Sequence, residues 1–245
     1  MAKEYRADDW QYYIMNWRGD PHPYMESLEN EIKEIDKALE ALFHYSILPH
    51  TNYDHDKMLT HREAVKLHFE IPWTGISPRM QRLLYAINAI AKPNIMVATG
   101  IFCGNTFISN AGAAIGPGAC YRAARLIGIE IDPDSAELAR KNIVTLDTCH
   151  QAEIITADGV RWLRAYTGTI DLLYIDADGA YLPIIKEASR GALHRGSFVL
   201  AHNSVNFSFS LASYLKYVRN PAHSIESVNM YVDDQGLEVT LWSHN

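Results

Sequence analysis

The chain has 245 residues, of which 48% are hydrophobic and 21% are charged, which is typical of a folded globular protein rather than a disordered one. It carries 22 basic and 29 acidic residues, a net charge of −7, so the positive field that nucleic-acid binding needs is not expected. No run approaches 18 apolar residues, which argues against a membrane helix. Three cysteines without metal-type spacing, and a charged amino terminus without an apolar core, predict a cytoplasmic protein without a disulfide framework.

Residues 1–70 are rich in charge, histidine and tyrosine, and we expect them to form a helical amino-terminal extension. One helix is predicted from Pro23 to Tyr45, because apolar residues recur there at a spacing of three to four. A second, shorter helix is predicted from Asp56 to Phe69. We interpret residues 1–70 as a lid or dimerisation segment, and we expect a homodimer.

Residues 71–245 alternate short apolar runs with amphipathic segments, which predicts parallel strands joined by helices on both faces of a sheet. A terminal hairpin is predicted around the turn 233–236. The expected fold is an α/β doubly wound, mostly parallel sheet of seven strands. The predicted strands are Asn94–Thr99, Leu126–Ile131, Ala152–Thr156, Ile170–Ile175, Ser197–Ala201, Ser224–Val232 and Leu237–Trp242.

Ligands of such sheets bind outside the carboxyl ends of the strands, so the loops that follow the strands are candidate sites. Gly100 and Gly104 follow the first strand, but no Lys-Ser or Lys-Thr pair comes after them, which argues against a phosphate loop. Glu130 ends the second strand, where an acidic side chain accepts ribose hydroxyls. Asp158 and Gly159 end the third strand, where the acid either accepts from an adenine amino group or caps a helix.

Taken together in this order, these loops resemble those of class I S-adenosylmethionine (SAM)-dependent methyltransferases. The likeness is strongest to catechol and caffeoyl-CoA type O-methyltransferases, and it covers residues 76–243. The matching motifs are Ile76-Ser77-Pro78, Gly100-x-x-Cys103-Gly104-x-Thr106, Ile129-Glu130-Ile131-Asp132-Pro133, Ile175-Asp176-Ala177-Asp178 and Ala201-His202-Asn203.

The resemblance implies a Rossmann-like methyltransferase fold, with SAM as co-substrate, a small-molecule acceptor and a role in secondary metabolism. Gly100, Phe102, Gly104 and Asn105 would hold the methionine part of SAM, and Glu130 the ribose. Ile131, Asp158 and Gly159 would lie at the adenine. Asp176, His202 and Asn203 would be the catalytic residues, with Asp176 also near the cofactor.

Three positions depart from the family pattern. Ala98 stands where an acid usually positions the cofactor amine. His202 replaces an aspartate of the metal triad, and an imidazole does not favour Mg²⁺. Gly179 stands where a lysine usually acts as general base. The sequence therefore predicts no metal at this site.

These departures leave three functions open. The first is methyl transfer to a small molecule, with His202 as general base. The second is a SAM cyclase, in which the amine of SAM attacks its own Cγ and gives azetidine-2-carboxylate and methylthioadenosine. The third is a non-catalytic SAM-binding module. A dense set of aromatic residues would form a lid over the cofactor, or else pack in a core or a dimer interface: Trp10, Tyr12, Tyr13, Trp17, Tyr24, Tyr45, Tyr53 and Trp73.

Overall fold

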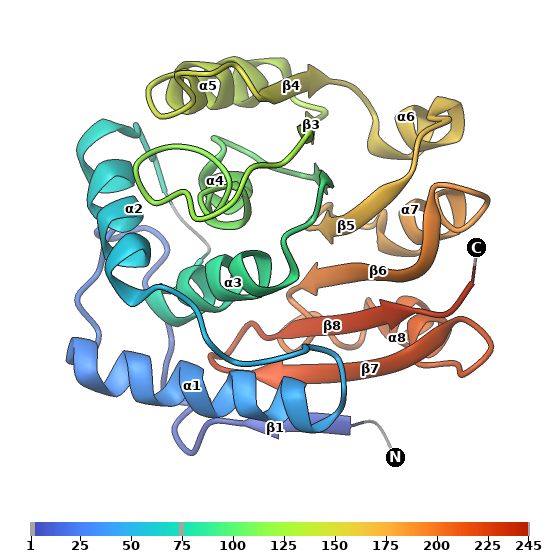
Figure 1. The fold of residues 1–245 in the computed structure, drawn as a ribbon, viewed down its shortest axis with the longest axis horizontal. Coiled ribbons are helices and arrows are strands. Elements are labelled where there is room, and N and C mark those ends of the chain that lie inside the picture. Colours follow the sequence, from blue (N-terminus) through green and yellow to red (C-terminus); the bar gives the residue numbers. More distant parts are fainter. Residues whose placement is uncertain (1–2, 74–75, 245) are drawn as a thin grey trace.

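The computed structural model describes residues 3–73 and 76–244, and it shows one central sheet with helices on both faces (Figure 1). The strands lie in the order β1-β7-β8-β6-β5-β2-β3-β4. Among the described residues, β8 alone runs antiparallel to its neighbours, β6 and β7. The strands are β1 (Lys3–Arg6), β2 (Ile95–Thr99), β3 (Arg125–Glu130), β4 (Ala152–Thr156), β5 (Ile170–Ile175), β6 (Leu193–His202), β7 (Ser224–Tyr231) and β8 (Leu237–Trp242).

The mostly parallel α/β sheet and the terminal hairpin are confirmed, but the sheet has eight strands rather than the predicted seven. The additional strand, Lys3–Arg6, pairs in parallel with Val228–Tyr231 of β7. The amino-terminal extension is therefore not purely helical. It covers the edge of the sheet that β7 would otherwise expose.

The helices form two layers, with α1 to α5 on one face of the sheet and α6 to α8 on the other (Figure 1). They are α1 (Leu28–His44), α2 (His55–His68), α3 (Pro78–Ala91), α4 (Asn105–Ala111), α5 (Pro133–Val144), α6 (Gly159–Ala165), α7 (Tyr181–Ala188) and α8 (Ala212–Val218). No helix in the described part of the chain is long and apolar enough to cross a membrane.

Side-chain caps decide where several helices begin. Helix α1 begins at Leu28 rather than at Pro23 because the Ser27 hydroxyl accepts from the Asn30 backbone N–H. Asp132 caps α5 in the same way, with Pro133 in its first turn. Because Asp132 stands two residues after the end of β3, its cap holds this strand-to-helix loop in place.

The strand order reverses between β5 and β2. From β2 the chain moves outward through β3 to β4, whereas from β5 it moves the other way to β6. The loops after these five strands consequently meet at one edge of the sheet, which is where an open α/β sheet forms its ligand site.

One histidine is buried between α2 and the loop after α4. His61 is buried, with 4% of its surface exposed, and a Cβ added at Gly112 or Gly118 would overlap it. Burial, and to a smaller extent Arg62, lowers the pKa of His61 from 6.5 to about 4. Between about pH 6.5 and pH 4, His61 is therefore protonated in the unfolded chain but neutral in the folded chain. The free energy of unfolding consequently decreases as the pH falls through this range.

We expect His61 to cost about 2 kcal/mol of unfolding free energy between pH 7 and pH 5. Urea denaturation at both pH values measures this loss. His61→Gln should remove it, whereas the exposed control His44→Gln should keep it. An unchanged pH dependence in His61→Gln would contradict the assignment.

Candidate functional site

A cavity of about 910 Å³ opens at the carboxyl ends of β2 to β6. It lies at the reversal of strand order, as the sequence predicts. Gly104 does not line it: this residue is the N-cap of α4, with φ 89°, and a Cβ there would face Ala139 of α5. The predicted site residues that do line it are Gly100, Phe102, Asn105, Glu130, Ile131, Asp158, Gly159, Asp176, His202 and Asn203.

The loops after β2 and β5 are packed directly against each other. Gly100 has φ 74°, and a Cβ there would overlap the carbonyl of Asp176. Asp176 N donates to the Thr99 carbonyl at 2.9 Å. Glycine at position 100 thus allows the backbone to reach the start of the Asp176 loop.

Glu130 joins the β2 loop to the β3 loop. Its Oε2 accepts from Phe102 N at 2.7 Å, and its Oε1 accepts from Ile131 N at 2.9 Å and Asp132 N at 3.1 Å. Each carboxylate oxygen has two lone pairs, so Oε2 retains capacity for a ligand hydroxyl. Because Glu130 is nearly buried and fixed by the backbone, it presents a preorganised acceptor at the cavity wall.

Asp158 has the capping role that the sequence left open as one alternative. Its Oδ1 accepts from Arg161 N at 2.9 Å at the start of α6, and the residue also lines the cavity. Gly159 follows it in the first turn. Capping uses Oδ1, which leaves Oδ2 for a ligand amino group.

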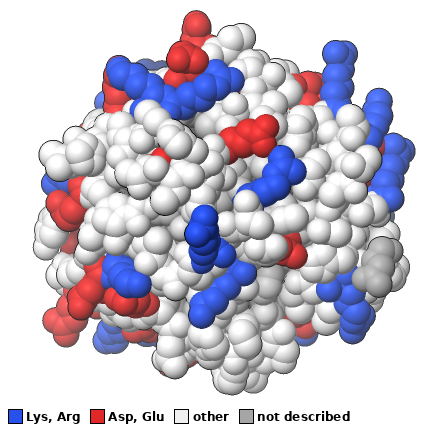
Figure 2. Space-filling model, turned by 45° about the horizontal axis from the view of Figure 1, so that its top comes forward, with Lys and Arg blue, Asp and Glu red and all other residues white. Residues whose placement is uncertain are grey.

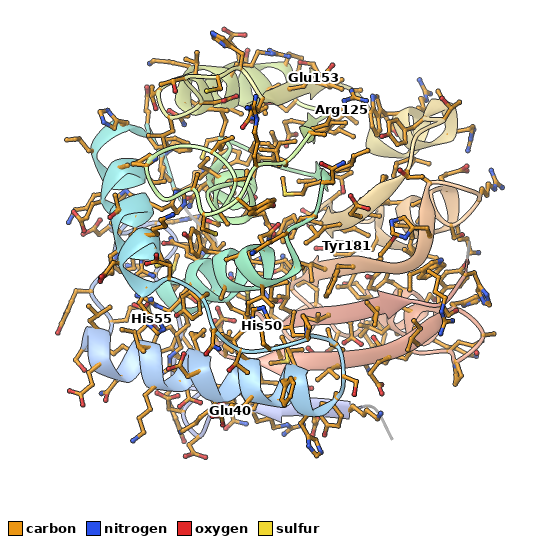
Figure 3. The ribbon with its side chains drawn as sticks, viewed as in Figure 1. Glu40, His50, His55, Arg125, Glu153 and Tyr181 are labelled. Atoms are coloured by element: carbon orange, nitrogen blue, oxygen red, sulfur yellow. The ribbon has the colours of Figure 1, made fainter. Side chains whose placement is uncertain are left out.

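Asp176 is the centre of the polar network at the other end of the cavity. Its Oδ1 accepts from Asn203 Nδ2 at 3.0 Å and from the Tyr181 hydroxyl at 3.3 Å. Its Oδ2 accepts from the Tyr174 hydroxyl at 3.4 Å and lies 3.2 Å from His202 Nδ1. Figure 3 labels Tyr181, which belongs to the first turn of α7.

The two tyrosines of this network stay protonated. Burial, reinforced by the charge of Asp176, raises the pKa of both Tyr174 and Tyr181 above the ordinary value of 10.0. Both hydroxyls therefore remain hydrogen-bond donors to the carboxylate at neutral pH. Neither tyrosine was predicted as a site residue, although Tyr174 lies on β5, two residues before Asp176.

His202 lies behind Asp176, with only 2% of its surface exposed. Burial lowers the pKa of His202, but the charge and hydrogen bond of Asp176, together with Asp233 and Gln235, raise the pKa further, so the net shift from 6.5 is upward. Gln235 lies close enough to His202 to raise its pKa, but within the described structure neither His202 Nε2 nor Gln235 Oε1 makes a hydrogen bond of regular geometry. The Asp176–His202 pair is thus arranged to take up a proton.

The residues at Asp176 do not fit a Mg²⁺ site. Asn203 and the two tyrosines point N–H and O–H groups at the carboxylate, whereas Mg²⁺ requires oxygen ligands in octahedral geometry. Gly179, in place of the usual lysine, has φ 69° and supplies no base. Among residues 3–73 and 76–244, no group of three or more His, Cys, Asp or Glu side chains is placed to hold a metal ion.

Aromatic side chains form one wall of the cavity. Trp73 lies 4.4 Å from Phe102 and 5.7 Å from Trp17 between ring centroids. Only Trp17 and Trp73 of the eight aromatics proposed as a lid line the cavity. The other six lie elsewhere: Tyr12 and Tyr24 are exposed, Trp10 packs on Tyr231, Tyr13 lies under Arg79, and Tyr45 and Tyr53 pack against the core.

Arg79 of α3 holds the amino-terminal segment at the cavity. It donates bidentately to Asp9, at 2.6 and 3.0 Å, and to Glu26, at 2.7 and 2.8 Å. Residues 14, 15 and 17 lie between these two anchors and line the cavity. No sequence pattern indicates this pairing, since the partners are 70 and 53 residues from Arg79.

Two further lining residues, Asp234 and Gln235, belong to the turn between β7 and β8. From the sequence, this segment was predicted only as a hairpin turn. Ala98, the position of the missing acid, lies in the core and does not line the cavity. The acid that usually faces the cofactor amine therefore has no counterpart at this position.

Several solved methyltransferases share this fold. The S-adenosylhomocysteine (SAH)-bound PaMTH1 of Podospora anserina superposes with a TM-score of 0.62 at 14% identity, over 90% of this chain and 99% of that one. An O-methyltransferase from Bacillus cereus in complex with SAH gives 0.60 at 15%, over 78% and 92%. TomG of Streptomyces achromogenes, an O-methyltransferase involved in tomaymycin synthesis and solved with SAM, gives 0.58 at 17%, over 89% and 100%. No family model and no curated protein matches the sequence.

Proposed function

We propose that this chain, which has the fold of class I methyltransferases, binds SAM in the cavity and transfers its methyl group to a small molecule. The observation that carries the proposal is Glu130, which is locked by three backbone N–H groups at the end of β3 and faces a cavity of about 910 Å³. An acid at this strand end accepts ribose hydroxyls.

The remaining lining residues fit the other parts of SAM. Ile131 is 65% exposed and offers an apolar surface to adenine, and Asp158 offers its free Oδ2 to the adenine amino group. Gly100, Phe102 and Asn105 line the part of the cavity beside Trp73, where the methionine part of SAM would lie. SAM bound there supplies an activated methyl group at its sulfonium.

The reacting end follows from the Asp176 network. Asp176 faces the cavity, and His202, hydrogen-bonded behind it, is the stronger base of the pair. An acceptor group held against Asp176 passes its proton to the pair as its lone pair attacks the methyl carbon. The protein contributes mainly by aligning the acceptor, the methyl group and the sulfur, and no step requires a metal.

One observation favours a second function, the SAM cyclase. The aromatic wall of Trp17, Trp73 and Phe102 lies beside the glycine loop, where rings attract a sulfonium and fold the methionine arm back. Ala98 leaves the amine of SAM without its usual acid partner. We place this function second for two reasons. The cavity has room for an acceptor molecule, and the Asp176–His202 pair beside it can accept a proton, whereas the cyclase reaction needs no acceptor molecule.

Mass spectrometry of the protein incubated with SAM alone separates the functions. Intact, bound SAM supports methyl transfer, and acceptors can then be screened by SAH release. Release of methylthioadenosine with azetidine-2-carboxylate supports the cyclase and overturns methyl transfer. A non-catalytic module would consume no SAM with any acceptor. The homodimer, the cytoplasmic location and a role in secondary metabolism stay predictions.

Glu130→Ala is expected to weaken SAH binding about tenfold or more, because the ribose loses its acceptor and Phe102 N loses its anchor. Isothermal calorimetry measures this affinity. Glu153→Ala is the matched control, since Glu153 pairs with Arg125 on β3 and β4 and does not line the cavity (Figure 3). Equal affinities in both variants would contradict the assignment.

Metal chelation is expected to leave activity unchanged, because hydrogen-bond donors rather than metal ligands surround the Asp176 carboxylate. Initial rates with and without EDTA measure this. A rate that EDTA abolishes and Mg²⁺ restores would refute the prediction.

A further inference from the structure

The cavity has a one-sided charge. Among the described residues that line it are five carboxylates, Glu130, Asp158, Asp176, Asp178 and Asp234, and no lysine or arginine. On the face drawn in Figure 2, by contrast, acidic and basic side chains are interspersed over a largely uncharged surface. An interior field of a single sign selects ligands of the opposite charge.

The five carboxylates divide into two groups. Glu130 and Asp158 belong to the proposed cofactor end, where their partners are backbone N–H groups and the neutral ribose and adenine. Asp176, Asp178 and Asp234 belong to the acceptor end, formed by the β5 loop and the β7–β8 turn. In the described structure neither Asp178 nor Asp234 forms an ion pair. SAM brings one net positive charge, which leaves this end negative.

A second observation is that some hydrogen-bond acceptors at the acceptor end have no donor in the protein. His202 lines the cavity with 98% of its surface buried, and its Nε2 has no partner within the described structure. Gln235 Oε1, from the neighbouring turn, is unpartnered too. Together with the carboxylates of Asp178 and Asp234, this end offers acceptors to a ligand that carries several donors, and an ammonium group carries three.

Aromatic rings complete this environment. Phe207, which is 44% exposed, lines the cavity together with Asp178. Trp17 and Trp73 line the cavity wall that the amino-terminal segment forms. Aromatic faces attract a cation, and a flanking apolar surface holds the carbon skeleton that bears it. A phenolate or carboxylate acceptor would instead meet repulsion from three carboxylates.

We propose that the acceptor is an amine that binds as its ammonium form and is methylated on nitrogen, an inference that rests on the proposed methyl transfer. The ammonium gives one proton to the Asp176–His202 pair. The freed nitrogen lone pair forms the N–C bond to the methyl carbon while the C–S bond breaks and its electrons pass to sulfur. The products are the N-methylated ammonium and SAH, so atoms and charge balance.

The test measures binding to the SAH-loaded protein by calorimetry with three compounds of similar shape: 2-phenylethylamine, 2-phenylethanol and 3-phenylpropionate. We expect the amine to bind about tenfold or more tighter than the alcohol, and the carboxylate more weakly still. Indole and straight-chain sets with the same three end groups repeat the comparison. A preference for the alcohol or the carboxylate in any set, or equal or undetectable binding in all sets, overturns the inference.

Variants identify the groups responsible. Asp178→Asn combined with Asp234→Asn should reduce the preference for the amine at least about fivefold, since both changes keep the side-chain shape and remove the charge. Glu137→Gln, an exposed residue that does not line the cavity, is the control and should leave the preference unchanged. A preference for the amine that survives the double change refutes the assigned residues.

Failure of the proposed function is distinguishable from failure of this inference. If SAH does not bind in the first titration, methyl transfer fails, whatever the amine series shows. If SAH binds and the amine preference is absent, the acceptor class alone is wrong. The two outcomes are separable, because the amine titration begins only from protein that is already saturated with SAH.

Discussion

Replacing Glu31 by glutamine is expected to lower the free energy of unfolding by about 3–5 kcal/mol, because it leaves a buried arginine without its counter-charge. Glu31 lies on α1 and is 5% exposed. Its Oε1 accepts from Arg82 Nε at 2.5 Å and from Arg62 Nη2 at 2.7 Å, while Oε2 accepts from Arg62 Nη1 at 2.9 Å. Arg82 has no exposed surface, so water cannot replace the carboxylate.

This carboxylate connects three helices, since Arg62 belongs to α2 and Arg82 to α3. Burial raises the pKa of Glu31, but the two arginines lower the pKa by more, so Glu31 is ionised in the folded protein. Urea denaturation monitored by circular dichroism measures the loss. Glu137→Gln, which breaks an exposed pair with Arg140, is the control and should change stability by less than about 1 kcal/mol. A similarly small loss in Glu31→Gln would contradict the prediction, because it would show that Arg82 does not depend on the charge of Glu31.

The strands were the most predictable part of the fold, because a buried parallel strand is a short apolar run bounded by turn residues. The predicted bounds of Ala152–Thr156, Ile170–Ile175 and Leu237–Trp242 agree with β4, β5 and β8. Strand β1 was missed because its sequence, Lys3-Glu4-Tyr5-Arg6, is charged. Its place at the sheet edge depends on pairing with β7 more than 200 residues away.

The site was predictable where it follows directly from strand ends. Ten of the eleven site residues that the sequence analysis named line the cavity. The exception among the glycines is Gly104, which the helix start turns away from the cavity. The position after a strand end predicts that a residue lies near the cavity, but the start of the following helix decides whether the residue faces it.

The acceptor end was predictable only at Asp176, His202 and Asn203, because its other residues come from distant segments. Trp17 arrives through the ion pairs of Arg79, and Asp234 arrives through a hairpin turn whose sequence indicates only a turn. Both placements depend on tertiary contacts that leave no local pattern. The acidic, donor-poor character of this end therefore became apparent only from the structure.

His202→Asn is expected to lower kcat by a factor of about 10² or more while SAH affinity stays within about twofold. The asparagine amide nitrogen takes the place of Nδ1 and keeps the hydrogen bond to Asp176, but the basic imidazole is lost. The turnover number with a saturating acceptor, together with SAH calorimetry, measures both effects.

The pH profile distinguishes this role from a structural one. Since Asp176 raises the pKa of His202 above 6.5, the neutral base is depleted in acid, and kcat/KM should rise with pH through an apparent pKa above 6.5. This limb should vanish in His202→Asn. His202→Gln, whose amide reaches the Nε2 position but gives up the bond to Asp176, should lose both turnover and order at Asp176. A retained acid limb in His202→Asn would assign the proton acceptor to another group, because nothing else in the Asp176 network of donors titrates in that range.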